Sequence, residues 1–170
     1  MSVTVFFTDH LNALSCEAKK SLRARQHHNI HETYEESCQR LLNAIEVNSY
    51  IRPHRHSLDP KVETLIAVRG FFALITFCYD GSVEKIVRFG TEKYQNDKSN
   101  SVGVELQPGT WHTILALVSD SILFELKAGP FNPQAAKEFA AWAPEEDSTE
   151  EAQAYLQKLH SMVRFGDVGD

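Results

Sequence analysis

The chain has 170 residues and a formal net charge of −6, which suits one hydrophobic core and argues against general nucleic-acid binding. A hydrophobic content of 42%, with 10% aromatic residues, argues against intrinsic disorder. No apolar run reaches the roughly 20 residues that span a bilayer. The N-terminus has no charged region followed by a long apolar stretch, so we expect no signal peptide.

Three widely spaced cysteines, Cys16, Cys38 and Cys78, form no Cys-x-x-Cys pair. This pattern predicts free, mostly buried thiols in a reducing compartment. We therefore expect a cytoplasmic protein.

The first predicted element is a helix over residues 8–24, with Thr8 as its candidate cap. Its apolar stripe consists of Leu11, Leu14, Ala18 and Leu22. Residues 25–37 are polar, and we expect them to be irregular. Residues 39–45 fit a strand or a short helix, because they show no clean period.

Strands dominate the rest of the chain. They are predicted over residues 50–56, 62–68, 71–79, 83–89, 102–106, 111–118 and 121–127. Several are apolar on both faces, which suits two sheets packed face to face. After Pro130 and Pro133 we expect a helical tail that breaks at Pro144 and resumes near Ser148.

The most informative motif is Pro53-His54-Arg55-His56, followed by Glu63 and later by His112. Histidines at i and i+2 on a strand point to the same side. Three imidazoles and one carboxylate form a common ligand set for one divalent transition metal, with Zn, Fe, Mn, Ni and Co all acceptable. The alternative, ordinary strand histidines, is disfavoured by the order and spacing of the whole set.

The same parity extends upstream to Tyr50 and Arg52, which we expect to face the barrel lumen beside the metal. Arg52 is a candidate to bind an anionic substrate group, or else makes an ion pair at the rim. Tyr50 and Glu125 are candidate acid–base groups, although each can instead be a satisfied buried polar group.

Three more residues are candidates for contact with substrate. His28 and His31 lie in the polar segment, where they either close over the barrel mouth or are simply solvated. Trp111 packs the core next to His112 or stacks on a sugar ring.

These motifs resemble those of the cupins. His54, His56, Glu63 and Gly70 resemble the first cupin motif, and Pro108-Gly109-Thr110-Trp111-His112 resembles the second. Six residues separate His56 from Glu63 where the family usually has three or four, which makes Glu63 the least secure ligand. The resemblance implies a mainly β fold: a cupin-type double-stranded β-helix (jelly-roll barrel) with an N-terminal helical extension and C-terminal helices.

From about residue 10 to residue 146 the chain also resembles the WbuC-type cupin-fold metalloproteins. The matching segments are Arg25, His28–His31, Gln39–Ala44, Arg52–His56, Pro108–His112, Phe124-Glu125, Gly129-Pro130 and Phe139–Glu145. This resemblance implies a bound metal and a link to bacterial surface polysaccharides, and it names no reaction. We expect one globular domain, with a barrel at 38–131, an N-terminal segment at 1–37 and a tail at 132–170.

Three functions fit the pattern. The first is a metal-dependent enzyme acting on a small polar metabolite such as a sugar or sugar nucleotide, by isomerisation, epimerisation or a lyase step. The second is an Fe(II)-dependent dioxygenase, and the third is a non-catalytic module that binds a small ligand. In each case we expect a small-molecule partner, no nucleic acid, no membrane, and barrel edges compatible with a homodimer.

Overall fold

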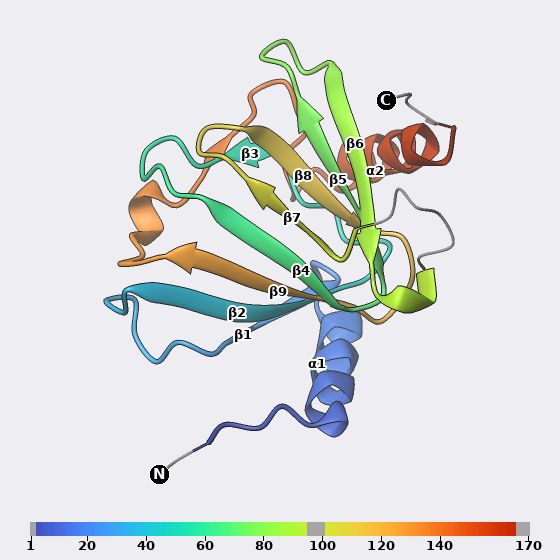
Figure 1. The fold of residues 1–170 in the computed structure, drawn as a ribbon. Helices are drawn as coiled ribbons and strands as arrows, with labels where there is room; N and C mark the ends of the chain where they lie inside the picture. Colours follow the sequence, from blue (N-terminus) through green and yellow to red (C-terminus); the bar gives the residue numbers. More distant parts are fainter. Residues whose placement is uncertain (1–2, 95–100, 166–170) are drawn as a thin grey trace.

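Ten strands form two antiparallel five-stranded sheets in the computed structural model, which describes residues 3–94 and 101–165 (Figure 1). Sheet A has the order β1 (Arg25–Asn29), β2 (Cys38–Ile45), β9 (Ser121–Ala128), β4 (Glu63–Arg69) and β7 (Gly103–Leu106). Sheet B has the order β10 (Glu138–Phe139), β3 (His54–Arg55), β8 (Trp111–Ala116), β5 (Phe71–Phe77) and β6 (Val83–Gly90). Neighbours in each sheet come from distant parts of the chain, which confirms the predicted cupin-type jelly roll.

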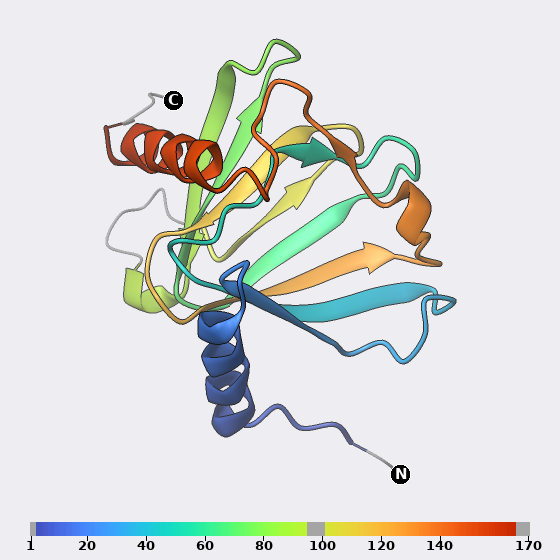
Figure 2. The ribbon, with the colours of Figure 1, turned by 180° about the vertical axis from the view of Figure 1, so that it is seen from behind.

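The core has three layers because both sheets are apolar on both faces. Between the sheets lie Ile45, Ile51, Leu65, Phe72, Leu74, Phe89, Leu106, Ile114 and Leu123. The other face of sheet B carries Ala73, Ile75, Phe77, Trp111 and Leu115, which α2 (Thr149–Phe165) covers with Ala152, Leu156, Leu159 and Val163. Figure 2 shows α2 beside sheet B and α1 (Thr8–Lys20) beside sheet A.

The first helix is shorter than predicted. It ends at Lys20, and its N-cap is Phe7, which makes no side-chain cap, so Thr8 does not cap it. Leu14 and Ala18 are buried against sheet A as expected, but Leu22 lies beyond the helix and is fully exposed.

Two longer segments differ from the predicted local structure. The polar segment expected to be irregular contains β1, which pairs with β2 along its whole length. The tail expected to be helical after Pro133 makes only a short 3-10 turn, Pro133–Ala135, followed by β10. We call residues 130–140 the strap, because they run from sheet A to sheet B along one end of the sandwich (Figure 2).

The cysteines and the loop after β6 are smaller features for which the sequence also made predictions. All three cysteines are free, as predicted, but they are exposed rather than buried. A second 3-10 turn, Glu92–Tyr94, begins the polar loop after β6, and residues 95–100 of that loop lie outside the described residues. Within the described ranges, no helix has the length and hydrophobicity needed to cross a membrane.

Candidate metal centre

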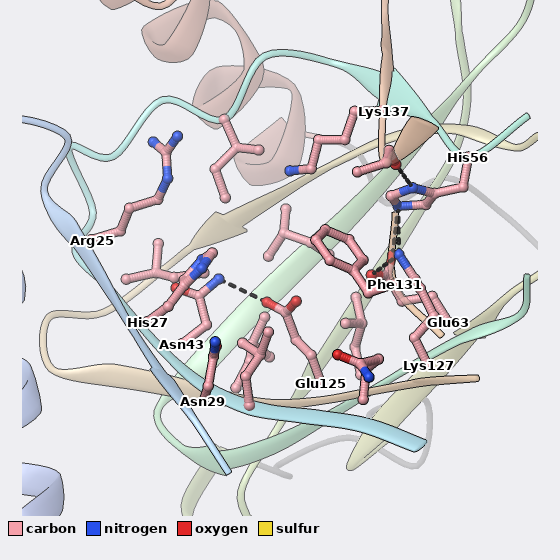
Figure 3. A pocket seen from close by; sticks show the side chains of 18 of the residues that line it. Arg25, His27, Asn29, Asn43, His56, Glu63, Glu125, Lys127, Phe131 and Lys137 are labelled. Atoms are coloured by element: carbon pink, nitrogen blue, oxygen red, sulfur yellow. Dashed lines mark hydrogen bonds and ion pairs between the residues drawn. The ribbon is translucent and has the colours of Figure 1, made fainter. Parts of the chain in front are cut away.

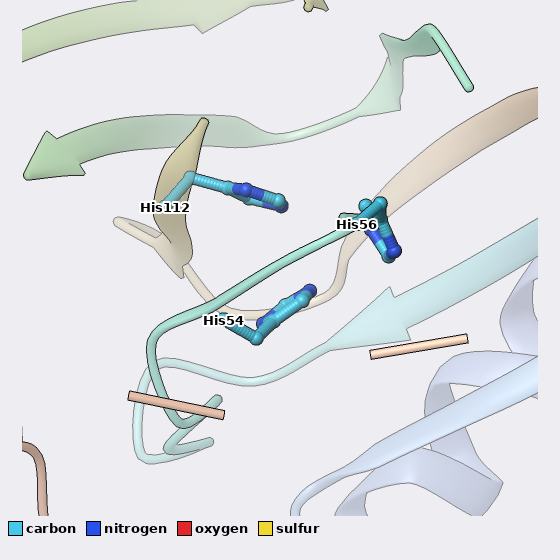
Figure 4. Close-up of side chains that lie close together, drawn as sticks. All are labelled: His54, His56 and His112. Atoms are coloured by element: carbon cyan, nitrogen blue, oxygen red, sulfur yellow. The ribbon is translucent and has the colours of Figure 1, made fainter. Parts of the chain in front are cut away.

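Three buried histidines meet at one end of the space between the sheets (Figure 4). His54 on β3 and His112 on β8 are direct cross-strand partners, with ring centroids 4.5 Å apart. The His56 ring lies 5.2 Å from that of His54 and 5.6 Å from that of His112. One ring nitrogen from each lies within 4.8 Å of the other two, a spacing that one metal ion can bridge.

Each ring is oriented by a hydrogen bond from its Nδ1 to a backbone carbonyl. The pairs are His54 with Arg52 at 2.9 Å, His56 with Ala136 at 2.5 Å, and His112 with Thr110 at 2.9 Å. A carbonyl oxygen only accepts, so Nδ1 carries the proton in all three rings. The three Nε2 atoms are therefore left as the lone-pair donors, which is the way metal-binding histidines are commonly held.

Glu63 lies beside two of the three histidines despite the long segment that precedes it, although, in the part of the chain that the structure describes, the group of mutually close ligand atoms consists of the histidines alone. Its Oε2 lies 3.2 Å from Nε2 of His56 and 3.5 Å from Nε2 of His112. In neutral rings both nitrogens are acceptors that face a carboxylate oxygen, which is also an acceptor. These lone pairs repel one another unless a cation lies between them. That cation is either a proton or a metal ion.

Among the described residues, Lys127 is the only lysine or arginine within ion-pair distance of Glu63. Its Nζ lies 2.9 Å from Oε1 of Glu63 and 3.1 Å from Nε2 of His56. The contact follows from sheet register, because Glu63 on β4 and Lys127 on β9 are directly opposite. Lys127 therefore neutralises the carboxylate in the absence of a metal.

The protonation states of the cluster suit a cation. Burial, helped by the charges of Lys137 and His112, lowers the pKa of His54 well below its usual value, so the ring is neutral near pH 7. Burial opposes ionisation of Glu63, but it is outweighed by hydrogen bonds from His112 and His56, which form when a proton rather than a metal ion lies at Nε2, and by the charge of Lys127. The pKa of Glu63 is consequently held well below its usual value.

The cluster opens into a cavity of about 530 Å³ between the sheets (Figure 3). Residues from β1, β2, β4 and β9 line one side, sheet B lines the other, and Phe131, Ala136 and Lys137 of the strap line the end. A volume of this size holds a small metabolite. The candidate metal centre therefore lies at one end of a larger cavity.

Glu125 projects into this cavity from β9. Its Oε1 accepts a hydrogen bond of 2.7 Å from Nδ2 of Asn43, and no described residue bonds its Oε2. Burial and the charge of Glu63 raise its pKa above the usual value for a carboxyl group. A carboxyl group with a raised pKa and one free oxygen can accept and return a proton.

Three residues predicted to line the site lie outside the cavity. Residues 50–53 do not form a strand, so the expected parity fails for Tyr50 and Arg52. The Tyr50 hydroxyl donates to the carbonyl of Pro144, and Arg52 donates to the carbonyl of Ala140. Trp111 points to the opposite face of β8 from His112 and packs in the core, under the guanidinium of Arg55.

His28 and His31 both border the cavity, but neither contacts the metal cluster. The His28 ring packs against His10 of α1, with 4.4 Å between ring centroids. His31 is buried, and its Nδ1 contacts the backbone of Arg40. Both positions are compatible with a role at the cavity wall.

Sequence reasoning missed Lys127, Lys137 and Asn43. Lys127 had a usable signal, because it lies two residues after Glu125 on a predicted strand and so shares its face. Asn43 lies on β2, whose strand character was left open. Lys137 lies in the strap, which was predicted to be helical, so no pattern pointed to it.

Comparisons with known proteins concern the fold. A family model described as a domain of unknown function, DUF6016, matches residues 6–89, and no curated protein matches the chain. A Shewanella oneidensis protein structure has 9% identity and a TM-score of 0.54, covering 78% of this chain and 84% of that one.

Two further structures are similar at lower scores. A cupin 2 domain-containing protein from Halorhodospira halophila has 14% identity and a TM-score of 0.46, covering 86% of this chain and 85% of that one. KdgF from Halomonas sp. has 17% identity and a TM-score of 0.44, covering 65% and 82%. At these identities the likeness to the S. oneidensis protein is one of fold alone, and no activity is carried over to this chain.

Proposed function

We propose that the chain is a metalloenzyme that binds one divalent transition metal through Nε2 of His54, His56 and His112, with Glu63 as the fourth ligand. The observation that carries the proposal is the set of three Nδ1–carbonyl hydrogen bonds, which leave three buried lone pairs directed at one point. The resemblance to WbuC-type cupins, on the motif residues quoted above, supports the same ligand set.

The donor set fits a catalytic rather than a structural ion. It holds three imidazoles with the Glu63 carboxylate beside two of them, and the three cysteines lie elsewhere and are exposed. Sites built this way leave positions open for water or substrate, and the adjoining cavity gives access to them. When bound, the ion supplies Lewis-acid chemistry that polarises a carbonyl or hydroxyl oxygen.

The surrounding side chains have distinct roles in this proposal. Glu125 moves a proton at its free Oε2, while Asn43 fixes the carboxyl group through Oε1. Lys127 orients Glu63, and the carbonyl of Ala136 orients the His56 ring. The reaction class that fits one polarised oxygen and one proton-transfer group is isomerisation, epimerisation or elimination on a small polar metabolite. The WbuC-type resemblance favours a sugar or sugar nucleotide.

The test is to purify the protein anaerobically, load it separately with Zn, Mn, Ni and Fe(II), and follow sugar nucleotides by NMR. We expect substrate conversion that Glu125→Gln abolishes while metal content stays unchanged. Oxygen consumption by the iron form alone would instead indicate a dioxygenase. Tight ligand binding without conversion in every metal form would indicate a non-catalytic binding module.

A further inference from the structure

The cavity concentrates positive charge inside an acidic protein. Leaving histidines aside, its lining contains four basic side chains and two acidic ones: Arg23, Arg25, Lys127 and Lys137 against Glu63 and Glu125. The chain as a whole carries a formal net charge of −6. A cation at the metal centre makes the excess larger, so the cavity favours an anionic ligand.

Two of the four basic side chains are already paired. Arg25 contacts Glu146 at 2.5 Å and donates to the carbonyl of Tyr50 at 2.8 Å. Lys127 pairs with Glu63. Arg23 is exposed at the rim. Lys137 is also exposed, and no described residue lies within hydrogen-bond or ion-pair distance of its Nζ.

The position of Lys137 suits a ligand that also reaches the metal centre. Its side chain projects from the strap into the cavity, and Glu125 projects from the opposite wall, on β9 (Figure 3). Its charge favours the neutral form of His54 and the ionised form of Glu125, so it acts on both parts of the site. The Lys137 side chain is accessible to solvent, so its ammonium group is free to donate charge-assisted hydrogen bonds to a negative group on a ligand.

We propose that Lys137 binds the carboxylate of a small hydroxylated organic acid, while the free Oε2 of Glu125 accepts a hydrogen bond from one of its hydroxyl groups. This assignment rests on the proposed function, and it narrows the substrate class of the same cavity from sugars and sugar nucleotides to sugar-like acids. The carboxylates of Glu63 and Glu125 line the same cavity and repel a second negative charge, so a monoanion is favoured over a phosphate dianion. The volume of about 530 Å³ suits a ligand of sugar size.

The experiment compares acids with neutral partners of the same size by calorimetry. The pairs are D-gluconate with D-glucitol, D-glucuronate with D-glucose, and L-malate with 1,2,4-butanetriol, with D-glucose 6-phosphate as the phosphate probe. Each is titrated into metal-loaded and metal-free wild type, Lys137→Met and Lys137→Arg. Lys158→Met, at an exposed position on α2, is the matched control.

We expect at least one acid to bind at least tenfold more tightly than its neutral partner and than the phosphate. Lys137→Met should weaken that binding about tenfold or more, the loss expected for one charge-assisted hydrogen bond. Lys137→Arg should restore most of it, and Lys158→Met should change nothing. Equal binding within every pair, preference for the phosphate, or unchanged acid binding by Lys137→Met would each overturn the assignment. Metal content, measured on the same samples, tests the metal site separately, because acid binding that depends on Lys137 remains measurable in the metal-free protein.

Discussion

Replacing Lys127 with methionine should have opposite effects on the metal-free protein and on its affinity for metal. In the metal-free state, the ammonium group lies 2.9 Å from Oε1 of Glu63, and the two side chains are only 15% and 10% exposed. Removing one member of a buried ion pair costs about 3–5 kcal/mol because the remaining charge loses its partner. The imidazoles of His56 and His112 still contact Glu63, so we expect the lower value, about 3 kcal/mol.

A bound metal ion should cancel this loss. The ion compensates Glu63 directly, and Nε2 of His56 no longer has Lys127 as a competing partner at 3.1 Å. If the metal-bound variant is as stable as the metal-bound wild type, the thermodynamic cycle requires metal binding to tighten by the same 3 kcal/mol, about two orders of magnitude. The metal-free melting temperature should fall by about 6–12 °C for a chain of this size.

The assay is denaturant unfolding with and without metal, together with metal affinity from competition with a chelator. Lys61→Met is the matched control, because Lys61 is also 15% exposed and pairs with Asp59 at 2.8 Å, away from the histidines. Its stability loss should be the same with and without metal. Equal losses in both states for Lys127→Met, with unchanged metal affinity, would refute the placement of Lys127 beside the metal.

Three further predictions follow from individual contacts. Burial raises the folded-state pKa of Glu125, so the contribution of this group to stability is present below the unfolded pKa and is lost as pH rises through the folded pKa. Glu125→Gln should therefore gain stability relative to wild type as pH rises above about 4.5. Parallel pH profiles of metal-free unfolding for the two proteins would contradict this. Glu138→Ala removes a bidentate ion pair with Arg55, at 2.8 and 2.9 Å, that fixes the strap. Chemical denaturation should show less than about 1 kcal/mol of lost stability, but metal affinity should fall about tenfold because Ala136 no longer orients His56. Unchanged metal affinity would argue against this role of Ala136. Tyr50→Phe should cost about 1 kcal/mol through the hydrogen bond to Pro144 and leave metal content and turnover unchanged, whereas a selective loss of turnover would return Tyr50 to the site.

The metal motif could be predicted from sequence because its geometry is local. Strand parity places His54 and His56 on one side, and it places His112 with Ile114 on the inner face of β8, as the structure shows. Predicted strands that are apolar on both faces do pack against a second layer on each face. In such segments the pattern of side chains reflects the tertiary environment directly.

The remainder of the site depends on contacts between distant segments. The strap contains Gln134, Ala135, Ala136 and Lys137, which favour a helix locally. It is held extended instead by pairing of β10 with β3 and by the ion pair of Glu138 with Arg55. No local pattern reports such pairing, so Lys137 and the carbonyl of Ala136 could not be placed at the site from sequence.

The measurement that tests the central claim most directly is elemental analysis of the purified, tag-free protein beside a His54→Ala/His112→Ala double variant. His160→Ala, which alters a histidine on α2 outside the cavity, serves as the control. We predict close to one transition-metal ion per chain in the wild type and the control, and almost none in the double variant. Wild-type protein that stays free of metal after reconstitution, or a double variant that retains it, would contradict the metal site.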